Sequence, residues 1–176
     1  MKIFGITGFK DSGKTTLVVN VVEALSRKGL KVSTIKHAHC NFDIDHPGRD
    51  SFRHREAGAQ EVMIASNHRW AIMHELRQQP EPSLDDLLTK LTPVDLVIIE
   101  GFKQANHPKI QVVRPEHNNE ALPNEITNLV AIASDQKIDP VDYGCNGPHL
   151  DLNNTEQVCQ FILAHCQLTL SHEGLK

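Results

Sequence analysis

The stretch Gly8-Phe9-Lys10-Asp11-Ser12-Gly13-Lys14-Thr15 places two glycines five positions apart and follows the second with a lysine and a threonine. This spacing is the sequence form of a P-loop, a phosphate-binding turn between a strand and a helix. Glycines let successive backbone N–H groups converge on an anion, and the helix that follows points its positive dipole end at the same place. The pattern therefore predicts a site for a nucleoside triphosphate.

The segments on either side supply the strand and the helix that a P-loop requires. Residues 2–7 are mostly apolar and predict a short buried strand. Residues 17–25 repeat apolar side chains at helical spacing, and this helix is expected to end in two cations before Gly29. In such a loop the lysine, Lys14, reaches the β- and γ-phosphates, and the Thr15 hydroxyl binds Mg²⁺.

Composition and charge narrow the class of protein. The chain has 176 residues, 39% of them hydrophobic and 23% charged, which favours one nucleotide-binding domain over residues 1–170 and a loose tail over 171–176. A net charge of -4 gives no basic footprint for nucleic acid, and no apolar run approaches the ~20 residues of a membrane span. The N-terminus enters a strand without a signal-peptide pattern, and four widely spaced cysteines suggest free thiols, so we expect a cytoplasmic protein.

A second decisive stretch, residues 94–101, reads Val-Asp-Leu-Val-Ile-Ile-Glu-Gly. A nearly continuous apolar strand fits the centre of a parallel sheet covered on both faces. The strand ends in Glu100, the form expected of a Walker B strand, so Thr15 and Glu100 are the expected Mg²⁺ ligands. Because strand and helix patterns alternate, we predict an α/β, P-loop NTPase-like fold with a mainly parallel twisted sheet and helices on both faces.

The remaining elements follow from periodicity and turn residues. A β-hairpin is predicted from strands 61–66 and 69–74, joined by Asn67-His68. Other strands are expected over 30–37, 109–114 and 128–135, and helices over 51–57, 83–91 and 155–166.

The polar segment 38–50 follows a predicted strand at the edge where α/β sheets bind ligands. Asp43 and Asp45 in it are candidates for the metal or for positioning water, with a solvated turn as the alternative. His37, His39 and Cys40 offer metal-ligand chemistry, while a position beside the phosphates would equally suit contact with an anion.

Ser134 and Asp135 follow another apolar strand. GTPases place at such a position the aspartate that accepts hydrogen bonds from guanine N1 and N2. A helix cap or turn residue is the alternative interpretation of Asp135.

Several segments, in order along nearly the whole chain, share the pattern of one family. They are Gly-Phe-Lys-Asp-Ser-Gly-Lys-Thr-Thr at 8–16, Ile-Lys-His-Ala-His at 35–39, and the segments 42–51, 57–59, 69–71, 99–103, 133–135 and 150–153. In these segments the chain resembles the molybdopterin-guanine dinucleotide biosynthesis protein B family, a GTP-binding partner in bacterial molybdenum cofactor assembly. The His-x-His segment joined to Asp-x-Asp-x-Pro-Gly and followed by Glu-Gly-Phe-Lys is the specific part, since many families share the P-loop.

The resemblance implies a homodimer that binds GTP with Mg²⁺, hydrolyses it weakly at most, and assists the guanylyltransferase that joins GMP to molybdopterin. Molybdopterin, or its molybdenum form, is the implied second ligand. Lys14 and Glu100 are the residues implied in any hydrolysis. The implied contacts, by position, are Gly8, Asp11, Ser12, Gly13, Lys14, Thr15 and Thr16 with the phosphates, Thr15 and Glu100 with Mg²⁺, Ser134 and Asp135 with guanine, and His37, His39, Asp45 and Arg49 with the γ-phosphate or the pterin.

Three positions differ from the residues that the compared family patterns have there. Arg49 stands where the family pattern has a lysine, which keeps the charge but changes its geometry. Asn154 stands where an aspartate is expected, which weakens any role for that late segment. Phe9 occupies the place of the lysine that marks dimeric deviant-Walker ATPases, which argues against an ATPase site shared across a dimer.

Two other functions stay open on the residues alone. A nickel-loading metallochaperone GTPase would use His37, His39 and Cys40, although the chain has no Cys-Pro-Cys or His-rich tract. A small-molecule kinase would need an arginine-rich lid over the transferred phosphoryl group, and the clustered arginines are Arg49, Arg53 and Arg55.

Overall fold

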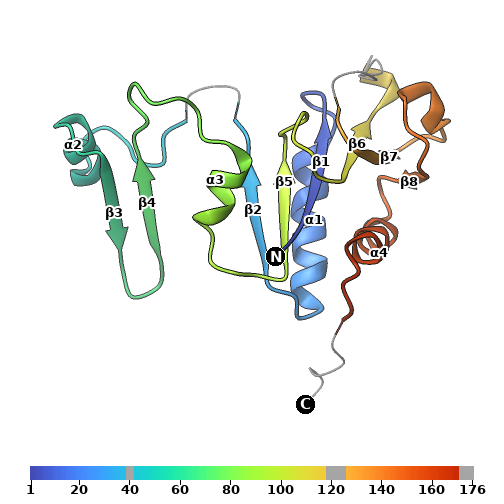
Figure 1. Ribbon diagram of the computed structural model, residues 1–176, viewed down its shortest axis with the longest axis horizontal. Helices are drawn as coiled ribbons and strands as arrows, with labels where there is room; N and C mark the ends of the chain where they lie inside the picture. Colours follow the sequence, from blue (N-terminus) through green and yellow to red (C-terminus); the bar gives the residue numbers. More distant parts are fainter. Residues whose placement is uncertain (39–41, 118–125, 171–176) are drawn as a thin grey trace. The chain divides into compact units, whose positions relative to one another are not determined.

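The computed structural model describes residues 1–38, 42–117 and 126–170, and the chain divides into two compact units (Figure 1). The larger unit consists of Met1–His37 and Leu88–Lys176, and the smaller unit of Ala38–Leu87. The expected tail, residues 171–176, lies outside the described residues. A single nucleotide-binding domain over residues 1–170 stays a prediction.

A six-stranded sheet forms the frame of the larger unit. Its strands lie in the order β2-β5-β1-β6-β7-β8, and every neighbouring pair is parallel. The strand before the P-loop, β1, therefore lies between β5 and β6, and its Ile6 is in register with Glu100 of β5. This arrangement confirms the predicted mainly parallel α/β fold. The strands are β1 (Lys2–Gly8), β2 (Val32–Lys36), β5 (Leu96–Glu100), β6 (Lys109–Val113), β7 (Leu129–Ser134) and β8 (His149–Asp151).

Two helices, α1 (Lys14–Arg27) and α4 (Thr155–Cys166), cover one face of this sheet. Leu17, Val21 and Leu25 repeat every four residues along α1 and are all buried against the sheet. They join Phe4 of β1 and Ile162 of α4 in the main core. Each such side chain contributes roughly 1.5–3 kcal/mol by leaving water, so this layer fixes where α1 begins relative to β1.

The opposite face carries a smaller core beside β6 and β7. Val113, Ile132 and Cys145 are buried there, with Tyr143 of the 3₁₀-helix η2 (Pro140–Tyr143) packed against them. A second 3₁₀-helix, η1 (Pro115–His117), follows β6.

The smaller unit contains the predicted hairpin. Helix α2 (Asp50–Glu56) is followed by β3 (Glu61–Ala65) and β4 (Trp70–His74), which pair antiparallel. The turn is closed by Ser66, whose backbone N–H donates to the Arg69 carbonyl at 2.9 Å. Helix α3 (Leu84–Thr89) comes next and begins at Ser83, whose hydroxyl accepts from the Asp86 N–H at 3.1 Å. Both helices and both strands match their predictions within two residues.

Some features were not predicted. The three-residue strand β8 and the two 3₁₀-helices are too short for periodicity to reveal them. Asn154, noted as a departure from the family pattern, caps α4 by accepting from the Gln157 N–H at 3.0 Å. The cysteines at 145, 159 and 166 are free and buried, as expected, and Cys40 lies outside the described residues. Burial raises the pKa of Cys159 to about 11, so its thiol stays protonated and unreactive.

A buried lysine lies on the face of the sheet opposite α1 and binds three backbone carbonyls there. Lys109 of β6 is fully buried, and its ammonium donates to the carbonyl oxygens of Ala105 at 2.7 Å, of His107 at 2.8 Å and of Thr127. Three acceptors match the three N–H groups of an ammonium, which satisfies a cation that burial would otherwise penalise heavily. Burial lowers the pKa of Lys109 from 10.5 to about 8.

We expect Lys109→Met to lower the free energy of unfolding by about 2–4 kcal/mol at pH 7, because buried carbonyls lose a charged donor. Between pH 8 and 10.5 the unfolded chain holds a proton at this lysine that the folded protein has released, so rising pH favours the native state. The wild type should therefore gain stability relative to Lys109→Met from pH 8 to 10 in urea titrations. Lys90→Met, at an exposed position, is the control. A wild-type advantage that is absent or independent of pH would contradict this account.

Candidate functional site

The P-loop connects β1 to α1 at the carboxyl edge of the parallel sheet. Gly8 and Gly13 have φ values of +149° and +95°, in the region that favours glycine. A Cβ at Gly8 would lie 2.5 Å from the Val112 carbonyl oxygen and 2.9 Å from the Ser12 hydroxyl oxygen. Only glycine fits between the loop and β6. The loop therefore has the backbone of an anion-binding turn, with Gly13 as the residue before α1.

The side chains within the loop are placed for an anion. Lys14 folds back over the loop and its ammonium donates to the Phe9 carbonyl oxygen. Partial burial lowers the pKa of Lys14, an effect that Glu100 partly opposes. The Ser12 hydroxyl is buried and makes no hydrogen bond within the described part of the chain. A buried donor without a partner and a desolvated ammonium would both gain from a bound phosphate.

Thr15 and Glu100 meet beside the P-loop. The Thr15 hydroxyl donates to Glu100 Oε1 at 3.0 Å, and the same oxygen accepts from Lys36 Nζ at 2.9 Å. Glu100 is 8% exposed, so its carboxylate is held in a fixed position at the end of β5. Lys36 was considered only as a possible contact for an anionic ligand, and its ion pair with Glu100 was not predicted. It reaches Glu100 because β2 and β5 are in register at these two positions.

The segment after Glu100 turns sharply and brings two more groups to the loop. Gly101 has φ +100°, and a Cβ there would lie 2.9 Å from His37 Cβ. The rings of Phe102 and His37 are stacked with their centroids 4.5 Å apart. Lys103 Nζ lies 5.6 Å from the centroid of the Phe9 ring. The Glu-Gly-Phe-Lys segment thus fixes the orientation of His37 and places a further cation near the P-loop.

Asp135 lies at the end of β7, two strands from β1. Its Oδ2 is 3.6 Å from Nε of Arg114, the residue after β6. The buried Ser134 accepts through its hydroxyl from the Gln136 N–H at 3.2 Å, which orders this strand end. Arg114 also lies against the P-loop, since its Nη2 is 3.3 Å from the position of a Cβ at Gly13. Arg114 was not predicted as a site residue, because a lone arginine after a short strand carries no motif.

In the smaller unit, Asp43 and Asp45 both pair with Arg55. The Arg55 guanidinium lies 2.9 Å from Asp45 Oδ1 and 3.1 Å from Asp43 Oδ1, and it also lies 3.4 Å from Glu75. The Asp45 side chain is only 4% exposed, so this cluster joins the loop to α2 and β4 from within the unit. Arg49, immediately before α2, is exposed.

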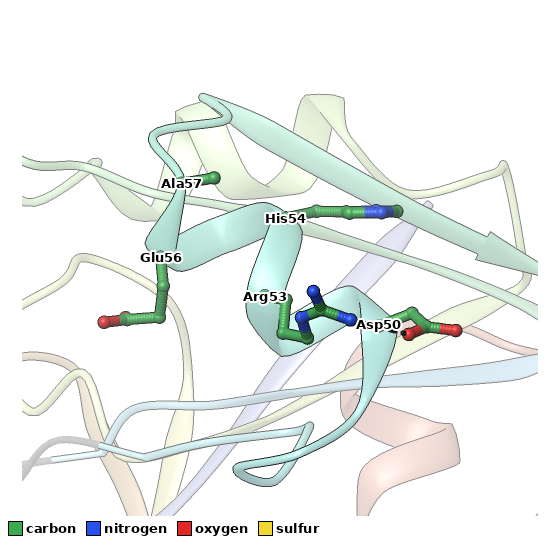
Figure 2. A pocket seen from close by; sticks show the side chains of 5 residues that line it. All are labelled: Asp50, Arg53, His54, Glu56 and Ala57. Carbon is green, nitrogen blue, oxygen red and sulfur yellow. Dashed lines mark ion pairs between the residues drawn. The ribbon is translucent and has the colours of Figure 1, made fainter.

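A surface hollow also lies in the smaller unit, along α2 (Figure 2). Figure 2 shows Glu56 and His54 pointing away from each other, so the polar groups do not converge. Arg53 Nη1 is 3.8 Å from Asp50 Oδ1, and both side chains are exposed. Arg53, one of the three candidate lid arginines, lines this hollow, but none of the residues expected to contact the nucleotide, Mg²⁺ or the pterin does.

The structure describes the ranges 1–38, 42–117 and 126–170. No cluster of three or more His, Cys, Asp or Glu side chains there is arranged to hold a metal ion. His39 and Cys40, two members of the predicted metal or anion group, lie outside these ranges. No helix in them has the length and apolar character needed to cross a bilayer.

Known proteins are similar to this chain over nearly its whole length. Residues 3–135 match the model of a family described as "Molybdopterin guanine dinucleotide synthesis protein B". A Haemophilus influenzae protein named "Molybdopterin-guanine dinucleotide biosynthesis adapter protein" is 39% identical over 163 residues, covering 91% of this chain and 86% of the relative. An Escherichia coli protein of the same name is 32% identical over 170 residues, covering 94% and 93%.

Solved structures of proteins of this family have a fold similar to that of this chain. A MobB protein homolog from Bacillus stearothermophilus has a TM-score of 0.71 and 25% identity, covering 95% of this chain and 99% of that one. A structure of molybdopterin-guanine biosynthesis protein B has a TM-score of 0.70 and 27% identity, covering 93% and 99%.

Proposed function

We infer the function of this chain from its family: it belongs to the molybdopterin guanine dinucleotide synthesis protein B family. It is an adapter protein in molybdopterin guanine dinucleotide biosynthesis. We propose that it serves there as a cytoplasmic GTP- and Mg²⁺-binding protein that assists the guanylyltransferase joining GMP to molybdopterin. Its P-loop is the site of this activity.

One observation carries the nucleotide proposal. The Thr15 hydroxyl lies 3.0 Å from a carboxylate oxygen of the nearly buried Glu100, directly beside the P-loop. Mg²⁺ uses few protein ligands and keeps several waters, which matches one hydroxyl and one carboxylate. The metal would neutralise charge on the phosphates, and the ammonium of Lys36 would exchange Glu100 for a phosphate oxygen. The phosphates would be held by residues 8–16, including the Asp11 and Thr16 positions.

Guanine is assigned to Ser134 and Asp135. An aspartate carboxylate accepts from both N1–H and the 2-amino group of guanine, a pattern that adenine does not offer. The position of Asp135 beyond β7, on the same edge as the P-loop, supports this assignment.

We propose that hydrolysis of GTP by this chain is weak. Lys14 and Glu100 are the groups that would act, yet a Glu100 carboxylate bound to Mg²⁺ would be poorly placed to take a proton from water. A kinase is disfavoured as well, because Arg55, one of its three candidate lid arginines, is committed to carboxylates. The nickel metallochaperone is disfavoured by the family.

The second ligand is proposed to be molybdopterin or its molybdenum form, bound by His37, His39, Asp45 and Arg49, residues that could instead meet the γ-phosphate. The exposed guanidinium of Arg49 suits the phosphate of a pterin ligand. Asp45 would contribute by holding Arg55 and so ordering the loop that carries Arg49.

A homodimer is proposed from the hairpin. Three large apolar side chains on one face of the β3–β4 hairpin are 43–63% exposed, namely Met63, Trp70 and Ile72. An isolated two-stranded hairpin is marginally stable in water, and an exposed apolar strip favours aggregation. Burying this strip between two copies would stabilise the hairpin and remove the exposed apolar surface.

The adapter proposal is tested by mixing purified chain with the molybdenum cofactor guanylyltransferase and measuring complex formation by size-exclusion chromatography. We expect a complex that GTP with Mg²⁺ strengthens, because the nucleotide orders the P-loop edge, and that ATP does not strengthen. Trp70→Ser serves as a matched variant that should disturb the dimer without removing the P-loop. No complex under any nucleotide condition would reject the proposed partner, and equal effects of GTP and ATP would reject guanine recognition.

A further inference from the structure

We propose that Arg114 couples the two halves of the nucleotide site, pairing with Asp135 when no nucleotide is bound and turning to a nucleotide phosphate when one is. The Asp135 carboxylate is then released to accept hydrogen bonds from guanine. This inference rests on the GTP site proposed above, and it adds a specificity-determining residue that the sequence patterns do not indicate.

Sheet order places Arg114 between the two groups that it would couple. Strand β6 lies between β1, which leads into the P-loop, and β7, which leads into Asp135. Val112 of β6 is in register with Gly8, and Val113 is in register with Ser134. The next residue after β6, Arg114, therefore stands at the sheet edge with the phosphate site on one side and the proposed guanine site on the other.

The guanidinium contacts both sides. Its Nη2 and Nε lie 3.3 and 3.4 Å from the position of a Cβ at Gly13, so it rests against the backbone where α1 begins. On the other side its Nε lies 3.6 Å from Asp135 Oδ2. A side chain at position 13 would crowd the guanidinium, so the last glycine of the P-loop also makes room for Arg114.

The Arg114–Asp135 pair is weak enough to exchange. The two side chains are 35% and 28% exposed, and the 3.6 Å between Arg114 Nε and Asp135 Oδ2 is long for a charge-assisted hydrogen bond. Ion pairs between partly exposed side chains contribute little free energy, because solvent screens them. A guanidinium has five donors in one plane and binds phosphate oxygens bidentately, so a polyphosphate in the P-loop competes well with the Asp135 carboxylate.

The exchange has a consequence for selectivity. While Asp135 is paired with a cation, guanine must displace that cation before it can donate to the carboxylate. Guanosine, which has no phosphate to draw Arg114 away, bears this cost in full, whereas GTP supplies the replacement partner itself. The site would therefore bind guanine nucleotides and discriminate against the free nucleoside.

The test uses Arg114→Gln in the full chain, with GTP, tripolyphosphate and guanosine as probes. We expect GTP and tripolyphosphate each to bind about 10-fold more weakly, since a charge-assisted phosphate contact is lost. Guanosine, followed by NMR titration, should bind about 3-fold more tightly, since Asp135 is no longer paired. Arg114→Lys keeps the charge without the planar fork and should fall between; it carries the test if Arg114→Gln does not fold. Arg27→Gln, at an exposed arginine on α1, should change none of the three affinities.

Opposite changes for GTP and guanosine are the signature of coupling. Equal weakening of all three probes would show a merely structural ion pair, and unchanged affinities would show no role in binding; either result overturns the proposal while leaving the GTP site standing. Failure of the wild type to bind GTP or tripolyphosphate overturns the GTP site itself, and this inference with it.

Discussion

Lys14→Ala is expected to weaken the binding of GTP with Mg²⁺ by at least ~100-fold, which corresponds to about 3 kcal/mol. The ammonium of Lys14 is held over the P-loop by the Phe9 carbonyl, and its burial makes water a poor alternative partner. A phosphate replaces that single carbonyl with charged oxygens. Isothermal titration calorimetry measures the loss directly.

The fold should survive this change. Burial disfavours the charged form of Lys14 and lowers its pKa, so removing the charge relieves a desolvation cost. We expect the free energy of unfolding to change by less than about 1 kcal/mol. Lys10→Ala, an exposed lysine of the same loop, is the matched control and should alter GTP affinity by less than about 3-fold. Similar losses in the two variants would mean that the loop attracts nucleotide only through its overall charge.

The elements that sequence predicts well are those specified locally. The order strand, Gly8-to-Thr15 loop, helix follows from residues that are neighbours in the chain, and the buried run before Glu100 can belong only to a central strand. Parallel order then brings Thr15 and Glu100 to the same edge, as predicted.

What the sequence does not reveal is which strands become neighbours. Lys36 reaches Glu100 through the register of β2 with β5, across 64 positions of the chain. Arg114 reaches both Gly13 and Asp135 only because β6 lies between β1 and β7. Residues whose role depends on strand order carry no local signature, since a single cation after a strand is common on any protein surface.

In the smaller unit, too, the sequence does not identify which residues become partners. The Asp-rich loop is recognisable by composition, yet composition does not identify Arg55 as the partner of both Asp43 and Asp45. Both carboxylates pair with Arg55 inside the unit, so Asp45 would act on a ligand through the position of the loop and not by direct contact.

Strand β8, in the larger unit, was missed for a simpler reason, because three residues are too few to show alternation.

Asp135→Asn is expected to reverse the base preference of the site from GTP to XTP. Guanine offers two donors, N1–H and the 2-amino group, and a carboxylate accepts both. An asparagine amide has one acceptor and one donor, so it faces the 2-amino group of guanine with a second donor. Xanthine carries an oxygen at that position and so matches the amide. We expect GTP to bind about 100-fold more weakly and XTP to become the preferred ligand, because mismatched polar groups at a binding site are strongly rejected.

The control for this reversal is Asp139→Asn, the same substitution at an exposed residue four positions later. Asp139 caps η2 by accepting from the Val141 N–H at 3.0 Å, and asparagine can do the same, so base preference should stay with GTP. The substitution at Asp135 also removes the partner of Arg114, which raises affinity for phosphate alone if the two side chains compete as proposed. Calorimetry with GTP, XTP and tripolyphosphate separates these effects, because only the base contact distinguishes GTP from XTP. If Asp135→Asn still prefers GTP to XTP, guanine is read elsewhere and Asp135 serves only as the partner of Arg114.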